Sequence, residues 1–142
     1  MEETLFIIKP DGVKRGLTGE IITRIERTGA KIVEMHRFVA WQDIARAIYD
    51  EHRAKPFFKD LTDTMCAGPS IWMIVQGNEV VKRMRALQGP AFDPPAGTIR
   101  GDFMYARPET VTHTSDSIEA GKREVAIMVR RVFMKLVQAA PV

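Results

Sequence analysis

The sequence contains very little cysteine and no long hydrophobic run, and both absences narrow what the protein can be. Cys66 is the single cysteine, so neither an internal disulfide nor a cysteine-based zinc cluster can form, and we expect a reducing compartment. The N-terminus reads MEETLFIIKPDG, which is acidic and only briefly apolar, so it predicts neither a signal peptide nor a membrane span. We therefore expect a soluble, cytoplasmic protein with no membrane partner.

Three common phosphate-handling signatures are also missing. The chain has no G-x-x-x-x-G-K-[ST] loop, no protein-kinase H-R-D or D-F-G set, and no G-x-G-x-x-G fingerprint. If the protein binds phosphate, side chains must hold it. The formal net charge of +3, from 21 Lys and Arg against 18 Asp and Glu, suits phosphorylated small molecules and falls short of a nucleic-acid footprint.

The remaining composition favours one compact domain over residues 1–142, because 45% hydrophobic residues supply a core without disulfides or metals. Apolar patterns predict strands over Thr4–Lys9, Lys31–Trp41, Ser70–Gly77 and Thr110–His113. This order predicts an α+β protein in which a β-α-β-β-α-β sandwich carries its helices on one face of the sheet.

Helix signals lie between these strands. The apolar spacing after Leu17 predicts a helix that stops at Gly29, and Asp43 and Asn78 are expected N-caps of two later helices. Pro56 is expected to break the first of these into a helical hairpin, and Gly89 to end the second. The segment PAFDPPAGTIRGDF is expected to lack regular structure, because its prolines and glycines are clustered.

His113 is the most informative of three histidines. It lies in TVTHTSDSIEAGKRE, just before a helix that Ser115 or Ser117 can cap. Glu124 falls about two turns beyond Ser117, so it could face the imidazole, orient it and fix which nitrogen is free to attack. The alternative is a structural histidine at a strand end. His36 and His52 are interpreted as structural or solvated, because they lack such surroundings.

Basic and aromatic residues beside turns complete the candidate site. Lys9, Arg85 and Arg100 each adjoin the end of a different element and together could neutralise a polyphosphate, unless two of them are ordinary surface charges. Tyr49 and Phe57 flank the break at Pro56, where an exposed ring would suit base stacking and a buried ring would only be core.

The segments IIKPDGVKRGLTGEII, KPFF, AGPSIWMIVQG, PAGTIRGDF and HTSDSIEAGKRE, in this order, resemble nucleoside diphosphate kinase. The resemblance implies a ferredoxin-like α+β sandwich with a four-stranded antiparallel sheet. It also implies a homo-oligomer, either tetramer or hexamer, and a ping-pong exchange between nucleoside di- and triphosphates through a phosphohistidine, with Mg²⁺ bound to the phosphates. By position it assigns phosphorylation to His113, its orientation to Glu124, support of transfer to Lys9, Tyr49 and Ser115, base contacts to Phe57 and Leu61, and phosphate contacts to Arg85 and Arg100.

The sequence departs from the family pattern at several positions. Ala91 replaces a usual threonine, Thr110 a usual asparagine and Thr114 a usual glycine, and the loop before TIRGD is about two residues shorter. We nevertheless expect a working enzyme, because the histidine, glutamate and cations all survive together. The alternatives are a catalytically weakened nucleotide-binding regulatory or scaffold protein of the same fold, and a small RNA-binding domain, which the lack of aromatic-basic RNA motifs disfavours.

Overall fold

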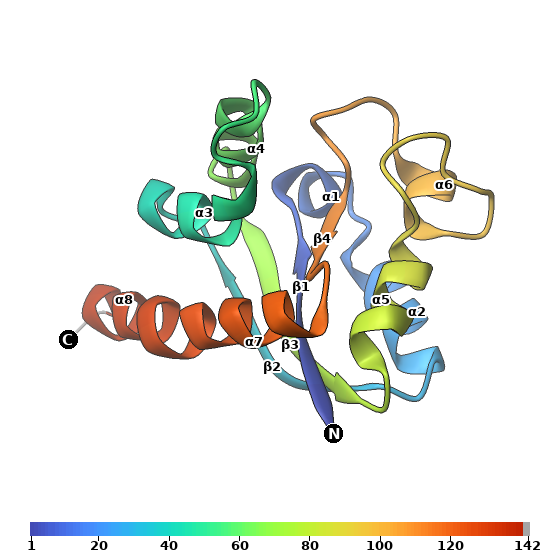
Figure 1. Ribbon diagram of the computed structural model, residues 1–142, viewed down its shortest axis with the longest axis horizontal. Coiled ribbons are helices and arrows are strands. Elements are labelled where there is room, and N and C mark those ends of the chain that lie inside the picture. The colour runs from blue at the N-terminus through green and yellow to red at the C-terminus, as the bar shows by residue number, and fades with distance from the viewer. Residues whose placement is uncertain (141–142) are drawn as a thin grey trace.

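The computed structural model of the protein describes residues 1–140, and residues 141 and 142 of the expected domain lie outside the described residues. Its strands are β1 (Glu2–Ile8), β2 (Lys31–Phe38), β3 (Ser70–Gly77) and β4 (Thr112–Thr114). They form one sheet in the order β2-β3-β1-β4, and every neighbouring pair is antiparallel (Figure 1). The predicted four-stranded antiparallel sheet is therefore confirmed, although β4 is only three residues long.

Eight α-helices connect and cover these strands within residues 1–140. They are α1 (Pro10–Lys14), α2 (Thr18–Arg27), α3 (Gln42–Ile48), α4 (Phe58–Met65), α5 (Val80–Gln88), α6 (Ile99–Phe103), α7 (Ile118–Ile127) and α8 (Phe133–Ala139). A 3₁₀ turn (Asp50–His52) lies between α3 and α4, and a π-helical turn (Met128–Val132) joins α7 to α8. None of the helices described is both long enough and apolar enough to cross a membrane.

The helices cover both faces of the sheet, so the expectation of helices on one face is wrong (Figure 1). Leu5 and Ile7 of β1 belong to the core cluster that also contains residues of α3 and of the π-helical turn. Phe6 and Ile8 belong to a second cluster with residues of α2 and α5. All four of these β1 residues are apolar, which is the pattern of a strand buried on both faces of the sheet. A strand buried on one face only would alternate apolar and polar residues.

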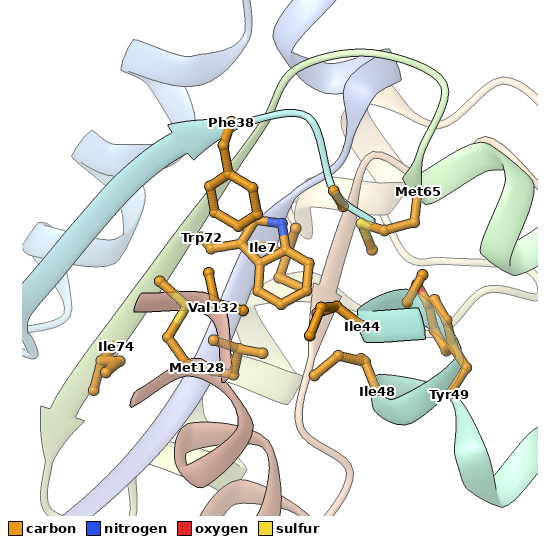
Figure 2. Packing of buried hydrophobic residues seen from close by; sticks show 13 residues of the cluster. Ile7, Phe38, Ile44, Ile48, Tyr49, Met65, Trp72, Ile74, Met128 and Val132 are labelled. Atoms are coloured by element: carbon orange, nitrogen blue, oxygen red, sulfur yellow. The ribbon is translucent and has the colours of Figure 1, made fainter. Parts of the chain in front are cut away.

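Trp72 lies near the centre of the first cluster (Figure 2). Its ring is fully buried, and its indole Nε1 donates a hydrogen bond to Ser70 Oγ at 2.9 Å. Ile48 and Tyr49, at the end of α3, occupy the side of this cluster that faces the helical hairpin (Figure 2). Core packing therefore fixes the position of Tyr49, a predicted site residue.

Two predicted helix caps are wrong by one or two residues. Trp41, not Asp43, is the N-cap of α3, and Asp43 lies in the first turn, where Arg131 and Lys135 pair with its carboxylate. Glu79, not Asn78, is the N-cap of α5, and it adopts a left-handed conformation with φ of 48°. Neither Trp41 nor Glu79 makes a side-chain capping hydrogen bond, so a search for the usual Ser, Thr, Asp or Asn cap does not find these helix starts.

The segment expected to lack regular structure contains the short helix α6. Thr98 caps it, because its Oγ1 accepts a hydrogen bond from the Gly101 backbone N–H at 2.9 Å. A Cβ atom at Gly101 would lie only 1.8 Å from the Pro95 carbonyl oxygen, so only glycine fits this close turn. The helix matters for the site because it carries Arg100.

Strand β2 is an edge strand with a shift in its pairing between Ile32 and Glu34. This irregularity explains why the alternation of β2 is not clean in the sequence, since an extra residue reverses the faces beyond it. His36 on this strand contacts Glu34 and packs against Phe133, which agrees with its structural interpretation.

Candidate active site

A cavity of about 630 Å³ opens between the α3–α4 hairpin and the loops on either side of α6. Six of the predicted site residues line it: Tyr49, Phe57, Leu61, Arg85, Arg100 and His113. The other three, Lys9, Ser115 and Glu124, are fully buried. The fold therefore brings together residues from both halves of the sequence.

His113 and Glu124 form the centre of the site. The imidazole Nε2 lies 2.7 Å from Glu124 Oε1, and Ser115 Oγ donates to the same oxygen at 3.1 Å. Glu124 is completely buried, and Arg123 Nη2 lies 3.6 Å from its other oxygen. A carboxylate only accepts hydrogen bonds, so it holds a proton on Nε2 and leaves the lone pair of the ring on Nδ1. The sequence prediction that Glu124 faces the imidazole is confirmed.

The local fold explains this geometry. His113 pairs with Ile7 in the β1–β4 ladder, and Ser115 Oγ accepts a hydrogen bond from the Leu5 backbone N–H at 3.2 Å. Ser117 then caps α7, because its Oγ accepts from the Ala120 N–H at 3.0 Å. Only two residues, 115 and 116, lie between the end of β4 and the N-cap of α7. Because this connection is short, α7 begins close to the strand end and brings Glu124 into contact with the imidazole.

Close packing of α7 on β1 depends on Gly121. A Cβ atom there would lie 3.0 Å from the Glu3 carbonyl oxygen, which is tighter than an ordinary contact. The small residue lets the helix approach the strand, and Glu124 lies about one turn further along the same helix.

Tyr49 contacts the imidazole from the side of α3. Its ring meets the His113 ring edge-on, with centroids 5.3 Å apart and an interplanar angle of 83°. Burial raises the pKa of the Tyr49 phenol above its usual value, so the group remains a neutral hydrogen-bond donor near pH 7. The sequence left open whether the Tyr49 ring is an exposed stacking surface or a core residue, and its burial in the first cluster confirms core packing.

Lys9 is a buried cation at the end of β1. Its Nζ donates to the Pro108 carbonyl oxygen at 2.9 Å and to Thr110 Oγ1 at 3.1 Å. Burial lowers the pKa of Lys9 to about 8, although the nearby Asp11 carboxylate opposes this effect. The departure at Thr110 therefore has a structural role, because its hydroxyl helps to hold the lysine.

Arg100 and Arg85 approach the cavity from α6 and α5. Arg100 donates to the backbone oxygens of Thr112 at 2.9 Å, Thr110 at 3.2 Å and Gly89 at 3.3 Å, and burial lowers its pKa to about 10. Arg85 is more exposed and pairs with Asp116, with Nη1 2.5 Å from Oδ1. Lys9 and Arg100 are thus not ordinary surface charges.

Phe57 stands at the rim of the cavity, with 46% of its surface exposed. The His52 ring lies 5.9 Å away between centroids, and Lys55 Nζ lies 5.5 Å from the centroid of the phenyl ring. The interpretation of Phe57 as a core residue is therefore wrong. An exposed ring beside a cavity is a surface on which a planar ligand can stack.

A cluster of Glu51, His52 and Asp116 was missed by the sequence reasoning. One ligand atom from each lies within 4.8 Å of the others, so the three could hold a metal ion. Burial and the hydrogen bond with Asp116 raise the pKa of Glu51, and burial lowers the pKa of His52. His52, which the sequence predicts to be structural or solvated, is half-buried and lines the cavity. No sequence signal reveals the cluster, because only the fold brings Asp116 to the hairpin.

Comparisons with known proteins show the family of this chain. The family model described as nucleoside diphosphate kinase matches residues 2–132. A protein of that name from Saccharolobus islandicus (strain L.S.2.15 / Lassen #1) is 46% identical over 130 residues, covering 89% of this chain and 94% of its own length. One from Methanosarcina barkeri (strain Fusaro / DSM 804) is 47% identical over 129 residues, covering 89% and 87%.

Two solved structures are also similar to this chain. The Aquifex aeolicus nucleoside diphosphate kinase superposes with a TM-score of 0.85 at 30% identity, over 92% of this chain and 96% of that one. A nucleoside diphosphate kinase family protein from Babesia bovis gives a TM-score of 0.84 at 43% identity, over 89% and 87%. With a matching family model over nearly the whole length and relatives at this identity, the chain belongs to the nucleoside diphosphate kinase family.

Proposed function

We propose that the protein transfers the γ-phosphoryl group of a nucleoside triphosphate to a nucleoside diphosphate, in two steps, through a phosphohistidine on His113. The observation that carries this proposal is the bond between His113 Nε2 and the buried Glu124, which leaves Nδ1 as the nucleophilic nitrogen at the cavity. Membership of the nucleoside diphosphate kinase family supports the same activity.

In the first step the Nδ1 lone pair attacks the γ-phosphorus atom. A nitrogen–phosphorus bond forms, the bond from phosphorus to the β,γ-bridging oxygen breaks, and the diphosphate leaves with the electron pair of that bond. The Nε2 proton stays shared with Glu124, whose negative charge balances the positive charge that develops on the ring. In the second step a β-phosphate oxygen of another diphosphate attacks the phosphorus atom of the phosphohistidine and forms an oxygen–phosphorus bond. The nitrogen–phosphorus bond breaks, and its electron pair returns to Nδ1 as the lone pair of the free imidazole.

The cations stabilise the transferred group in both steps. Lys9 and Arg100 are already fixed by hydrogen bonds to the backbone around the cavity, so they need little reorganisation when phosphate arrives. Arg85 must exchange its contact with Asp116 for a phosphate oxygen. Tyr49 and Ser115 support transfer indirectly, since one packs against the imidazole and the other bonds to Glu124.

The base is proposed to stack on Phe57, with Leu61 beside it on the same hairpin. Stacking accepts every base, because each has a planar face, and this permits a broad choice of nucleotides.

Magnesium is proposed to arrive with the nucleotide. The ion prefers oxygen ligands and commonly uses one or two carboxylates besides substrate phosphates. Asp116 lines the cavity, and a carboxylate oxygen of Glu51 lies within 4.8 Å of one of its oxygens. These residues fit the ion and would hold it beside the phosphates. When bound, it would neutralise phosphate charge during transfer.

Assembly and location are further parts of the proposal. We propose a homo-oligomer, tetramer or hexamer, and a cytoplasmic location, on the strength of the family resemblance. Sedimentation equilibrium of the purified protein distinguishes the two assemblies from each other and from a monomer. Specific binding of nucleic acid is not part of the proposal.

The test is a steady-state exchange assay with one triphosphate and one diphosphate. Parallel double-reciprocal lines are expected for the two-step route. His113→Ala should abolish exchange, whereas His36→Ala, which changes a histidine on the edge strand β2, should retain it. Substantial exchange by folded His113→Ala protein would contradict the mechanism and leave nucleotide binding in a regulatory or scaffold role, which family membership does not favour.

A further inference from the structure

A buried hydrogen-bonded network flanks His113 and has no role in the mechanism above. Gln88, the last residue of α5, is 2% exposed, and its side-chain amide contacts two hydroxyl groups of β4. Its Oε1 accepts a hydrogen bond from Thr112 Oγ1 at 2.7 Å, and its Nε2 donates to Thr114 Oγ1 at 3.0 Å. Both threonines are buried as well. One amide therefore bridges the two residues on either side of the nucleophilic histidine.

Strand β4 needs such support because it is short and lies at the edge of the sheet (Figure 1). It has three residues, and within residues 1–140 it pairs with β1 alone. Alternate residues of a strand point to opposite faces, so Thr112 and Thr114 lie on the face opposite the His113 imidazole. Glu124 holds the imidazole on one face, and Gln88 holds the strand from the other.

The network also meets the contacts of Arg100, the proposed phosphate-binding cation of α6. Arg100 donates to the carbonyl oxygens of Thr112 and Gly89, and Gly89 directly follows the bridging amide in the chain. The bond between Gln88 and Thr112 thus joins the two backbone segments that the guanidinium spans. Gly89 leaves little room for another arrangement, because a Cβ atom there would lie 2.5 Å from Thr98 Oγ1 at the cap of α6. Movement of β4 against the end of α5 would therefore displace the cation from the histidine.

A second cation is tied to the same bridge. Arg85 lies three residues before Gln88 on α5, so the two side chains share one face of the helix. Gln88 and Thr114 line the cavity together with Arg85 and His113. Transfer requires the nucleophilic nitrogen and the cations to face one phosphoryl group, and a misplacement of about 1 Å can slow such a reaction about a hundredfold. The bridge joins the helix that carries one cation to the strand that carries the nucleophile.

The network depends on Thr114, which stands where the family pattern has a usual glycine. A glycine has no hydroxyl and could not accept the bond from Gln88 Nε2. A buried amide is unfavourable when it lacks partners, so the three side chains depend on one another. The bridge therefore belongs to this chain rather than to the family pattern.

We propose that Gln88 is a positioning residue for phosphoryl transfer, which holds β4 and the end of α5 together so that His113 and the two arginines face one phosphoryl group. This inference rests on the proposed function and deepens it. Gln88 acts through the two threonine hydroxyls and requires no contact with the nucleotide.

The test compares two variants of Thr112. Thr112→Val keeps the shape of the side chain and removes the hydroxyl, whereas Thr112→Ser keeps the hydroxyl and removes the methyl group. Rapid-quench measurement at saturating ATP and Mg²⁺ gives the rate of His113 phosphorylation, and calorimetric titration gives the Kd for ADP.

Thr112→Val should slow phosphorylation about tenfold and raise the Kd by no more than about threefold, because ADP lacks the γ-phosphoryl group that the network positions. Thr112→Ser should phosphorylate within about twofold of the wild-type rate, although its lost methyl group destabilises the fold. This contrast separates a positioning role from a purely structural one.

Three further variants repeat the test on the rest of the network. Gln88→Leu and Thr114→Val should each slow phosphorylation about tenfold, whereas Thr114→Ser, which keeps the hydroxyl, should not. Where Thr112→Val does not fold, these variants decide the outcome.

Ser70→Ala is the matched control. Ser70 is also fully buried, and its Oγ accepts a hydrogen bond from Trp72 Nε1 at 2.9 Å, but neither residue lines the cavity. This variant loses a buried side-chain bond of the same kind. It should therefore lower the urea midpoint of unfolding and leave the phosphorylation rate unchanged.

Equal slowing by the valine and serine variants would overturn the inference, because the hydroxyl bonds would then not control the rate. Wild-type rates in Gln88→Leu and in the valine variants, or a loss of ADP affinity as large as the loss of rate, would also overturn it. Where the wild-type protein is phosphorylated on His113, these results overturn the inference alone. Wild-type protein that forms no phosphohistidine overturns the proposed function together with the inference.

Discussion

The buried Lys9 ammonium should give the protein opposite pH dependences of stability and activity. Its side chain is fully buried, and its pKa of about 8 lies below the value of 10.5 for a solvated lysine. Burial is the main cause, the Arg100 charge acts in the same direction, and the Asp11 and Glu109 carboxylates oppose it. Between pH 8 and 10.5 the unfolded chain therefore binds a proton at Lys9 that the folded protein has lost.

The sign and size of the stability effect follow from linkage. Stability rises with pH wherever the unfolded state binds more protons, so the contribution of Lys9 is least favourable below pH 8 and improves up to pH 10.5. At 1.36 kcal/mol for each pH unit, the interval from about 8 to 10.5 corresponds to about 3 kcal/mol in the free energy of unfolding.

Urea unfolding at several pH values between 7 and 10.5 measures this effect. Other groups titrate in the same range, so the quantity of interest is the difference between wild type and Lys9→Met, which lacks the titrating amine. The free energy of unfolding of the wild type should rise relative to the variant by about 3 kcal/mol across the range. Parallel curves would refute the reasoning.

Activity should move in the other direction. Because kcat/KM reports ionisations of the free enzyme, its value for transfer from ATP should fall as pH rises through about 8, where Lys9 loses the charge that neutralises phosphate. A kcat/KM that stays constant from pH 7 to 9.5 would contradict the assignment of Lys9 to the phosphate site.

Two further predictions concern His113 orientation and base binding. Glu124→Gln replaces the charged acceptor of the His113 Nε2–H by a neutral amide. The loss should raise the activation free energy of phosphorylation by about 1–2 kcal/mol and slow phosphorylation of His113 about 5- to 30-fold in a rapid-quench experiment. An unchanged rate would show that the carboxylate charge is not needed. Phe57→Ala removes an exposed stacking surface that contributes about 1–3 kcal/mol to base binding, so KM should rise for all diphosphates while kcat changes little. A decrease confined to kcat would contradict the assignment of Phe57 to base binding.

Much of the site could be predicted because its central residues lie close together in the sequence. His113, Ser115 and Glu124 belong to one strand end and the helix after it, so helical spacing alone brings the carboxylate towards the ring. Strands β1 and β3 were recognised for a similar reason, since each is a continuous apolar run bounded by turn residues.

The remaining features depend on contacts between distant segments. Asp116 reaches Glu51 and His52 only after the hairpin has folded over the end of the sheet. Gln88 reaches Thr112 and Thr114 only after α5 has packed against β4. Helix α6 was missed because its proline-rich surroundings hide the Thr98 cap. No local pattern encodes such contacts.

The most direct test of the phosphohistidine mechanism is intact-mass analysis of the protein after incubation with Mg²⁺ and γ-labelled ATP, under mildly alkaline conditions, followed by a chase with a second nucleoside diphosphate. We predict a single phosphoryl group that is lost in acid, maps to His113, is absent from His113→Ala, and passes to the added diphosphate. Folded, nucleotide-bound protein that acquires no phosphoryl group, or acquires it on another residue, would contradict the phosphohistidine mechanism.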